Sequence, residues 1–208
     1  MVKFLGYFDS GSDAMKDKYS NDSSAPDFPS KKIWTRLWPL MVAFFLWQCV
    51  LNRLPTLDNL HQRNSSLVTP SGNIIANVCC LCKLTAESNT HLFLECSLTK
   101  QIWGYFSLEA DKSINFSGST MDLINNWSTS RLSVRSKEVW KRLPGAILWV
   151  IWNERNARTF YKKERKVEEL IIDIKMKVFQ WARYSPYMSG IAISDLIVKR
   201  GELFFKPP

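Results

Sequence analysis

The chain has 208 residues, of which 46% are apolar, 23% are charged and nine are tryptophan, so it can build a hydrophobic core. Its apolar runs at residues 39–51 and 146–152 are shorter than the roughly 20 residues of a membrane-spanning helix, and residues 1–7 contain no apolar stretch of signal-peptide length. We therefore expect a soluble, intracellular protein with no membrane association, and we consider a nuclear location.

The net charge of +9 is unevenly distributed. Residues 1–130 contain 11 Lys and Arg against 11 Asp and Glu, whereas residues 131–183 contain 14 against 6. The last 25 residues contain 3 against 2. Almost all of the excess positive charge therefore lies in one block near the C-terminus.

Residues 1–30 are rich in Ser, Asp, Asn and Pro, which predicts a loosely ordered arm with one short helix near residues 13–19. From residue 32 to 53, apolar side chains recur at steps of three and four, which predicts a helix buried over a wide face. Pro39 lies within this run and predicts a kink or a boundary. A short helix through Arg63 should follow, with Thr56 as its N-cap.

Residues 74–78 predict a short strand that leads to a group of cysteines. Ser97 is a predicted N-cap for a helix with Trp103 on its apolar side, and residues 112–120 are a predicted loop. Pro144 suits the first turn of a further helix. The clearest helix is the last one, because its apolar side chains all fall on one face; they are Val167, Leu170, Ile171, Ile174, Val178 and Trp181.

Five cysteines occur, and four of them fall within 18 residues. An odd number so closely spaced argues against a disulfide framework and favours a metal site. Cys79, Cys82, His91 and Cys96 fit the spacing C-x2-C-x8-H-x4-C, and zinc favours four thiolate or imidazole ligands. The alternative is three buried free cysteines beside an unrelated histidine. One of only two histidines falls at ligand spacing, so zinc is the favoured interpretation.

Cys80 leaves the register of the site open. Pairing it with Cys82 would leave one residue between two ligands, which is poorer geometry for one ion, so we interpret Cys80 as a spare packed under the knuckle. Whether it replaces Cys79 is not decided by the sequence. Cys49 is expected to be a small core residue, and His61 is expected to be an ordinary surface histidine.

Several short motifs occur together in this part of the chain. They are Phe44-Phe45-Leu46-Trp47, Asn52-Arg53-Leu54-Pro55-Thr56, Cys79-x2-Cys82, Glu87, His91-Leu92-Phe93, Cys96, Ile102-Trp103 and, later, Trp149-x2-Trp152-x2-Arg155-Asn156. The motifs from Phe44 to Trp103 together resemble the zinc-binding domain of reverse transcriptases, which is abundant downstream of the polymerase in plant non-LTR retrotransposons. The later tryptophan motif resembles the tryptophan-rich helix that commonly follows this domain. The resemblance covers about residues 32–106 well and residues 140–160 partly. It implies zinc bound by Cys79, Cys82, His91 and Cys96, and an association with retroelement nucleic acid.

Together, the elements and the resemblance predict a mainly α fold: a helical domain with a small zinc-clasped β-hairpin or knuckle module. We predict five segments along the chain. They are an N-terminal arm (1–30), the reverse-transcriptase-type zinc-binding domain (31–110), a linker with the start of the basic helical part (111–139), basic tryptophan-rich helices (140–184) and an irregular tail (185–208).

Nothing in the sequence predicts catalysis. It contains no Asp-Asp pair for a two-metal polymerase site, no glycine-rich phosphate loop and no hydrolase motif. Four protein ligands leave a zinc ion no open position. The acidic cluster is interpreted as a solvated helical face; it comprises Glu164, Glu168, Glu169 and Asp173. We therefore expect an accessory module, either domesticated or a retroelement remnant without cellular function, with no enzymatic activity and no small-molecule substrate.

The basic block is the candidate for nucleic-acid binding, with RNA or single-stranded DNA as the partner. Basic side chains could face phosphates and Tyr161 could stack on a base; the candidates are Arg155, Arg158, Lys162, Lys163, Arg165 and Lys166. A solvated basic helix that binds nothing in particular is the alternative for this block. A protein–protein scaffold that uses the tryptophan-rich helices is the alternative for the whole chain.

Overall fold

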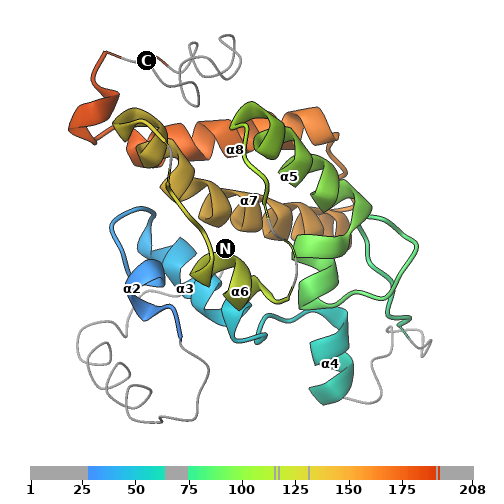
Figure 1. Cartoon of the computed structure of the whole chain (residues 1–208). Helices are drawn as coiled ribbons and strands as arrows, with labels where there is room; N and C mark the ends of the chain where they lie inside the picture. Colours follow the sequence, from blue (N-terminus) through green and yellow to red (C-terminus); the bar gives the residue numbers. More distant parts are fainter. Residues whose placement is uncertain are drawn as a thin grey trace.

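One long helix, α7 (Val134–Tyr161), is the central element of the fold. The structure, a computed structural model, describes residues 28–63, 75–114, 116, 118–130, 132–190 and 192. In Figure 1, α7 lies between a layer formed by α5 (Ser97–Glu109) and α8 (Val167–Ala182) and a layer formed by α3 (Leu40–Val50) and α6 (Thr120–Asn125). The remaining elements are α2 (Ser30–Ile33), α4 (Leu57–Arg63), the π-helical turn η1 (His91–Glu95) and the short η2 (Pro186–Met188).

The mainly α prediction is confirmed, but the β-hairpin is not found. The described residues contain no strand, and in the predicted strand residues 75–78 lack regular structure while residue 74 lies outside the described part. Hydrogen bonds here are local instead: Val78 N–H donates to the Ala76 carbonyl, and the Asn77 side chain accepts from Glu87 N–H at 2.8 Å. These backbone groups therefore have partners without a strand ladder.

The predicted boundary at Pro39 is confirmed, because α2 ends at Ile33 and α3 starts directly after Pro39. The short helix through Arg63 is present as α4, and the last helix is present as α8. The N-cap of α5 is Cys96, one residue before the predicted N-cap Ser97. The predicted helix at residues 13–19 lies outside the described residues.

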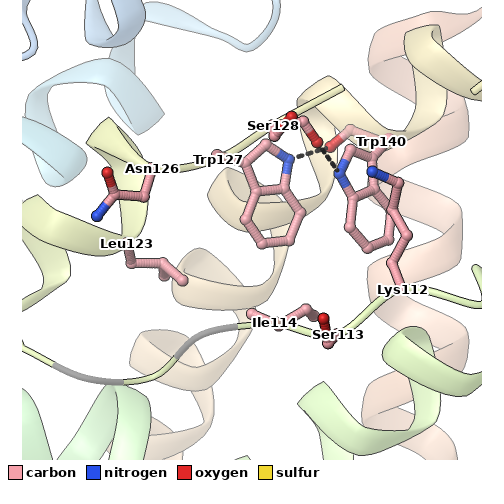
Figure 2. Close-up of a pocket in the computed structure, with 8 residues that line it drawn as sticks. All are labelled: Lys112, Ser113, Ile114, Leu123, Asn126, Trp127, Ser128 and Trp140. Carbon is pink, nitrogen blue, oxygen red and sulfur yellow. Dashed lines mark hydrogen bonds between the residues drawn. The ribbon is translucent and has the colours of Figure 1, made fainter. Parts of the chain in front are cut away.

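The prediction that Pro144 lies in the first turn of a helix is wrong. The residue lies ten positions after the start of α7, which begins after the Ser133 N-cap. A proline there removes the N–H that would bond to the carbonyl of Trp140. In Figure 2 the Trp127 indole N–H donates to that carbonyl instead, at 2.9 Å, and the two indole rings stack with centroids 4.6 Å apart. A tryptophan from outside the helix thus supplies the donor that the proline lacks.

All nine tryptophans are buried or half-buried, and several organise the core. Where α3, η1 and α7 meet, the Phe45 ring contacts Phe93, Trp149 and Trp152, with centroids 5.2 to 6.2 Å apart. Gly145 admits the Trp38 ring to the helix surface, because a Cβ there would lie 2.8 Å from it. The zinc-binding segment and the basic helices share this one core. None of the helices in the described ranges is long and apolar enough to span a bilayer.

Candidate metal centre

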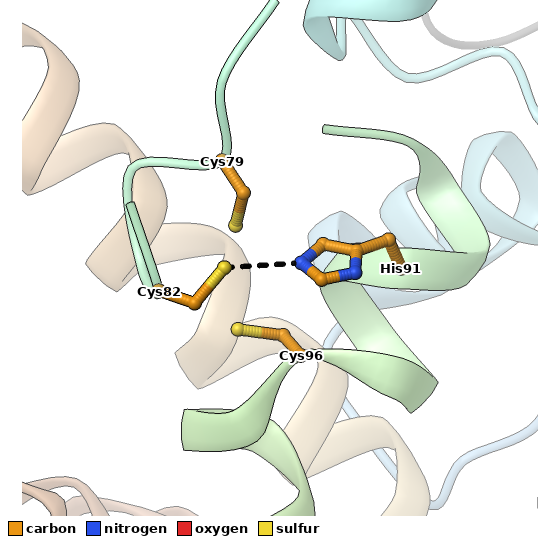
Figure 3. Close-up of side chains that lie close together, drawn as sticks. All are labelled: Cys79, Cys82, His91 and Cys96. Carbon is orange, nitrogen blue, oxygen red and sulfur yellow. Dashed lines mark hydrogen bonds between the residues drawn. The ribbon is translucent and has the colours of Figure 1, made fainter. Parts of the chain in front are cut away.

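The four predicted ligands converge in space. One donor atom from each of Cys79, Cys82, His91 and Cys96 lies within 4.8 Å of the others, and Figure 3 shows the three sulfurs and the imidazole directed at one point. Cys79 and Cys96 are buried, whereas Cys82 and His91 are partly exposed. The site therefore lies at the edge of the core.

The first two ligands are held by a tight knuckle, which we define as residues 79–87. Cys79 N–H donates to the Thr85 carbonyl and Lys83 N–H donates to the Cys79 carbonyl, both at 2.8 Å. Lys83 adopts a left-handed conformation, with φ of 59°, which closes the turn. Both sulfurs of this Cys-x2-Cys pair are thus directed to the same side.

The other two ligands flank the π-helical turn. Cys96 N–H donates to the His91 carbonyl at 2.7 Å, five residues back, and Cys96 then caps α5. The turn leaves two carbonyls for other donors: the Thr99 hydroxyl donates to that of Leu92 and the Trp103 indole N–H to that of Phe93. Single π-helical turns are frequent at functional sites, and here the turn places a ligand at each of its ends.

The sulfurs receive backbone N–H groups, as thiolate ligands do. The Cys79 thiol donates to Cys96, and this bond, together with the N–H groups of Leu98 and Thr99, outweighs burial and lowers the pKa of Cys96 to about 6. The same bond and burial raise the pKa of Cys79, although the N–H groups of Cys82 and Leu81 oppose the rise.

The pKa of the partly exposed ligand Cys82 is also shifted. Burial alone would raise the pKa of Cys82, but the N–H groups of Leu84 and Thr85, with the Thr85 hydroxyl and His91, bring it to about 7. The His91 Nε2 atom lies 3.4 Å from the Cys82 sulfur and 3.0 Å from the Thr85 hydroxyl. Three thiols with backbone donors and one imidazole match the chemistry of a structural zinc site.

Cys80 and the remaining predicted polar residues lie apart from this cluster. The Cys80 thiol donates to the Arg155 carbonyl of α7 at 3.6 Å, and the set of residues able to hold a metal does not include it. Cys49 is fully buried, and burial raises its pKa to about 12. His61 is partly buried, and its Nε2 atom has no hydrogen-bond partner among the described residues.

Two of the six residues that were predicted to bind nucleic acid are buried under the knuckle. Arg155 and Arg158 are 3% and 9% exposed. Arg155 pairs with the fully buried Glu87 at 2.7 Å, and Arg158 pairs with Glu154 at 2.8 Å while donating to the Leu81 carbonyl. Their guanidinium groups therefore hold the knuckle on α7 and do not face solvent.

The other four candidates remain in or next to solvent. Lys162, Lys163 and Lys166 are exposed, and Arg165 is partly buried because it pairs with Glu154 and Asp173 at 2.9 Å. Sequence reasoning missed the buried charge network of Glu87, Arg155, Glu154 and Arg158. The signal for it was spacing, because the two arginines continue the apolar stripe of α7 at the same three- and four-residue steps.

A hollow of about 130 Å³ lies elsewhere in the fold. Its lining, shown in Figure 2, consists of Lys112, Ser113, Ile114, Leu123, Asn126, Trp127, Ser128 and Trp140. Among the described residues that line it there is no histidine, cysteine or carboxylate.

The four side chains thus form a Cys3His cluster that could hold a metal ion. Residues 14–103 match the sequence family described as zinc-binding in reverse transcriptase, and these residues include all four ligands. This segment of the chain is a zinc-binding domain of the reverse transcriptase type, an accessory domain and not the polymerase itself, and its cofactor is zinc. No curated protein and no solved structure matches the chain significantly.

Proposed function

We propose that the chain is a non-catalytic, nucleic-acid-binding accessory domain of plant-type retrotransposon origin, with one zinc ion held by Cys79, Cys82, His91 and Cys96. The observation that carries the proposal is the closed tetrad inside a segment that matches the family. Four protein ligands leave zinc without an open position, so the ion stabilises the fold and does not activate water.

Nucleic-acid binding is assigned to the basic helical block at 131–183 and not to the metal site. The knuckle supports this division, because its Lys83 already pairs with Glu164 and its Glu87 with Arg155. A structural role for the zinc site is also consistent with its burial against α7. The scaffold alternative is less favoured, because the tryptophans that would form its contact surface are buried or half-buried.

The test combines metal content with salt-dependent binding. Purified full-length protein should contain one zinc per chain and bind single-stranded RNA or DNA oligonucleotides. The logarithm of the affinity should fall linearly with the logarithm of salt concentration, by roughly 0.7 per phosphate contact. Zinc-loaded, folded protein that binds no oligonucleotide at low salt would leave only the zinc-binding half of the proposal. Nucleotide incorporation or hydrolysis by rigorously purified protein would contradict the non-catalytic half.

A further inference from the structure

The basic block has two ends that differ in how their charges are used. We define the knuckle end as Phe160 and Tyr161 at the end of α7 with residues 162–173, and the distal end as residues 135–142 with residues 181–188. In Figure 1, α7 and α8 run side by side, and η2 lies at the distal end of this pair. The Arg142 guanidinium, which donates to the Trp181 carbonyl at 3.1 Å, joins the two segments of the distal end.

Charges cancel at the knuckle end. Residues 162–173 contain four basic and four acidic side chains. Glu164 pairs with Lys83, and Arg165 pairs with both Glu154 and Asp173. A phosphate strand that approached this end would meet carboxylates as often as cations.

Charges do not cancel at the distal end. Its described residues include five basic side chains, Arg135, Lys137, Lys141, Arg142 and Arg183, against the single carboxylate of Glu138. Glu138 is already engaged by Arg142 at 3.0 Å and Lys141 at 3.7 Å. Of the three that remain, Arg135 and Arg183 are exposed and Lys137 is half-buried.

The position of these cations runs against local helix electrostatics. The amino end of a helix carries partial positive charge and favours acidic residues, which α8 obeys with Glu168 and Glu169 in its first turn. The first turn of α7 has no acidic residue and contains Arg135 and Lys137. Local rules are most often broken where a site has another use, and cations gathered here suit an anionic partner.

Two exposed aromatic rings accompany the cations. Tyr184 and Tyr187 are 79% and 54% exposed. The Arg183 guanidinium lies over the Tyr184 ring at 4.6 Å, and Arg135 donates to the Tyr187 carbonyl at 3.1 Å. Met188, the last residue of η2, is 3% exposed and anchors this turn in the core. The rings are therefore presented on a fixed backbone.

We propose that the distal end is the nucleic-acid contact surface of this protein and that it takes single-stranded nucleic acid. Arg135, Lys137 and Arg183 contact the phosphates, while Tyr184 and Tyr187 stack on unpaired bases, which a duplex does not offer. This inference rests on the proposed function and replaces its general assignment to the basic block with one surface.

The test uses the full-length zinc-loaded chain and two matched pairs of variants. One pair removes three charges from each end: Arg135→Gln, Lys137→Gln and Arg183→Gln against Lys162→Gln, Lys163→Gln and Lys166→Gln. The other pair removes exposed rings: Tyr184→Ala with Tyr187→Ala, against Phe160→Ala with Tyr161→Ala. Anisotropy with fluorescent oligothymidine, oligouridine and a DNA duplex reports affinity across a salt series, and melting curves check that each variant folds.

The distal charge variant should reduce the salt slope by about two, since each lost contact removes roughly 0.7, and the knuckle-end variant should leave it unchanged. Loss of the distal tyrosines should weaken single-strand binding by about tenfold or more. Equal or stronger effects at the knuckle end would overturn this inference and leave the proposed function intact. Equal affinity for the duplex, with no effect of the tyrosine variant, would overturn the choice of single strands. A folded parent that binds no nucleic acid would overturn this inference together with the nucleic-acid half of the proposed function.

Discussion

The two ends of the α7–α8 pair contain similar numbers of basic residues but use them differently. Next to the knuckle end, Arg155 and Arg158 are buried against Glu87 and Glu154 and hold the metal-binding segment on α7. At the distal end, Arg135 and Arg183 are exposed beside two tyrosines. The comparison shows that a count of basic residues does not locate a binding surface, because part of the charge in this block serves the interior.

The largest expected effect is the loss of zinc, which should unfold the knuckle and leave the distal end folded. Cys96→Ser should abolish zinc binding and unfold the knuckle, because structural zinc contributes on the order of 10 kcal/mol in small finger peptides. Cys80→Ser is the matched control and should retain the metal, since its thiol faces α7. Elemental analysis gives the metal content, and amide spectra should show collapse of residues 79–96 with the distal end preserved. Retention of zinc by Cys96→Ser and its loss from Cys80→Ser would show that Cys80, and not Cys96, is a ligand.

The next effect concerns the buried ion pair that joins the knuckle to α7. Glu87→Gln should destabilise the protein by about 3–5 kcal/mol, because it leaves the Arg155 guanidinium buried without a counter-charge. Adding Arg155→Met to Glu87→Gln should restore much of that loss, since it removes the unpaired charge while the introduced amide oxygen can still accept from Leu57 N–H, as the carboxylate does. Denaturant unfolding of the zinc-loaded protein measures both variants. A double variant that is less stable than Glu87→Gln alone would show that the packing of the Arg155 side chain, and not its charge, governs the stability of the pair.

A smaller effect is expected near the distal end, where Trp127 supplies the hydrogen bond that Pro144 cannot. Trp127→Phe should cost about 1–3 kcal/mol, because the buried Trp140 carbonyl loses its donor. In a Pro144→Ala background the same change should cost less, since the alanine N–H can donate to that carbonyl. A double-mutant cycle measures the difference. Additive effects in the cycle would show that the indole contributes packing alone.

The parts of the fold that depend on neighbouring residues in the sequence could be predicted from it. The spacing of Cys79, Cys82, His91 and Cys96 identified the set of side chains that converge, and the apolar face of α8 indicated its extent. Pro39 marked a helix boundary because it is the N-cap of α3, where an N–H would have no partner within the helix. In each case the determining signal lies within one short segment of the chain.

The errors arose where a distant residue supplied the missing partner. Pro144 is tolerated within α7 because Trp127 donates from outside the helix. Arg155 is buried because Glu87, 68 positions away, provides a carboxylate. The knuckle needs no strand ladder because Asn77 and turn carbonyls satisfy its backbone. Such pairings become visible only when the tertiary structure brings the partners together.

The smallest expected effect compares the exposed Lys83, whose partner lies at the knuckle end, with the half-exposed Lys141 of the distal end. Lys83 pairs with Glu164 at 2.6 Å at the knuckle end, and Lys141 lies 3.7 Å from Glu138 at the distal end. Exposed ion pairs contribute little to stability because solvent and salt screen them. Lys83→Gln and Lys141→Gln should therefore leave the melting temperature unchanged within error.

The effects of the two variants on nucleic-acid binding should still differ. Lys141→Gln should lower the salt slope for single-stranded oligonucleotides by a fraction of one contact, because it reduces the positive potential around Arg135 and Arg183. Lys83→Gln should leave the slope unchanged, because the proposal assigns no phosphate contact to the knuckle end. A slope that falls for Lys83→Gln and not for Lys141→Gln would reverse the assignment of the two ends.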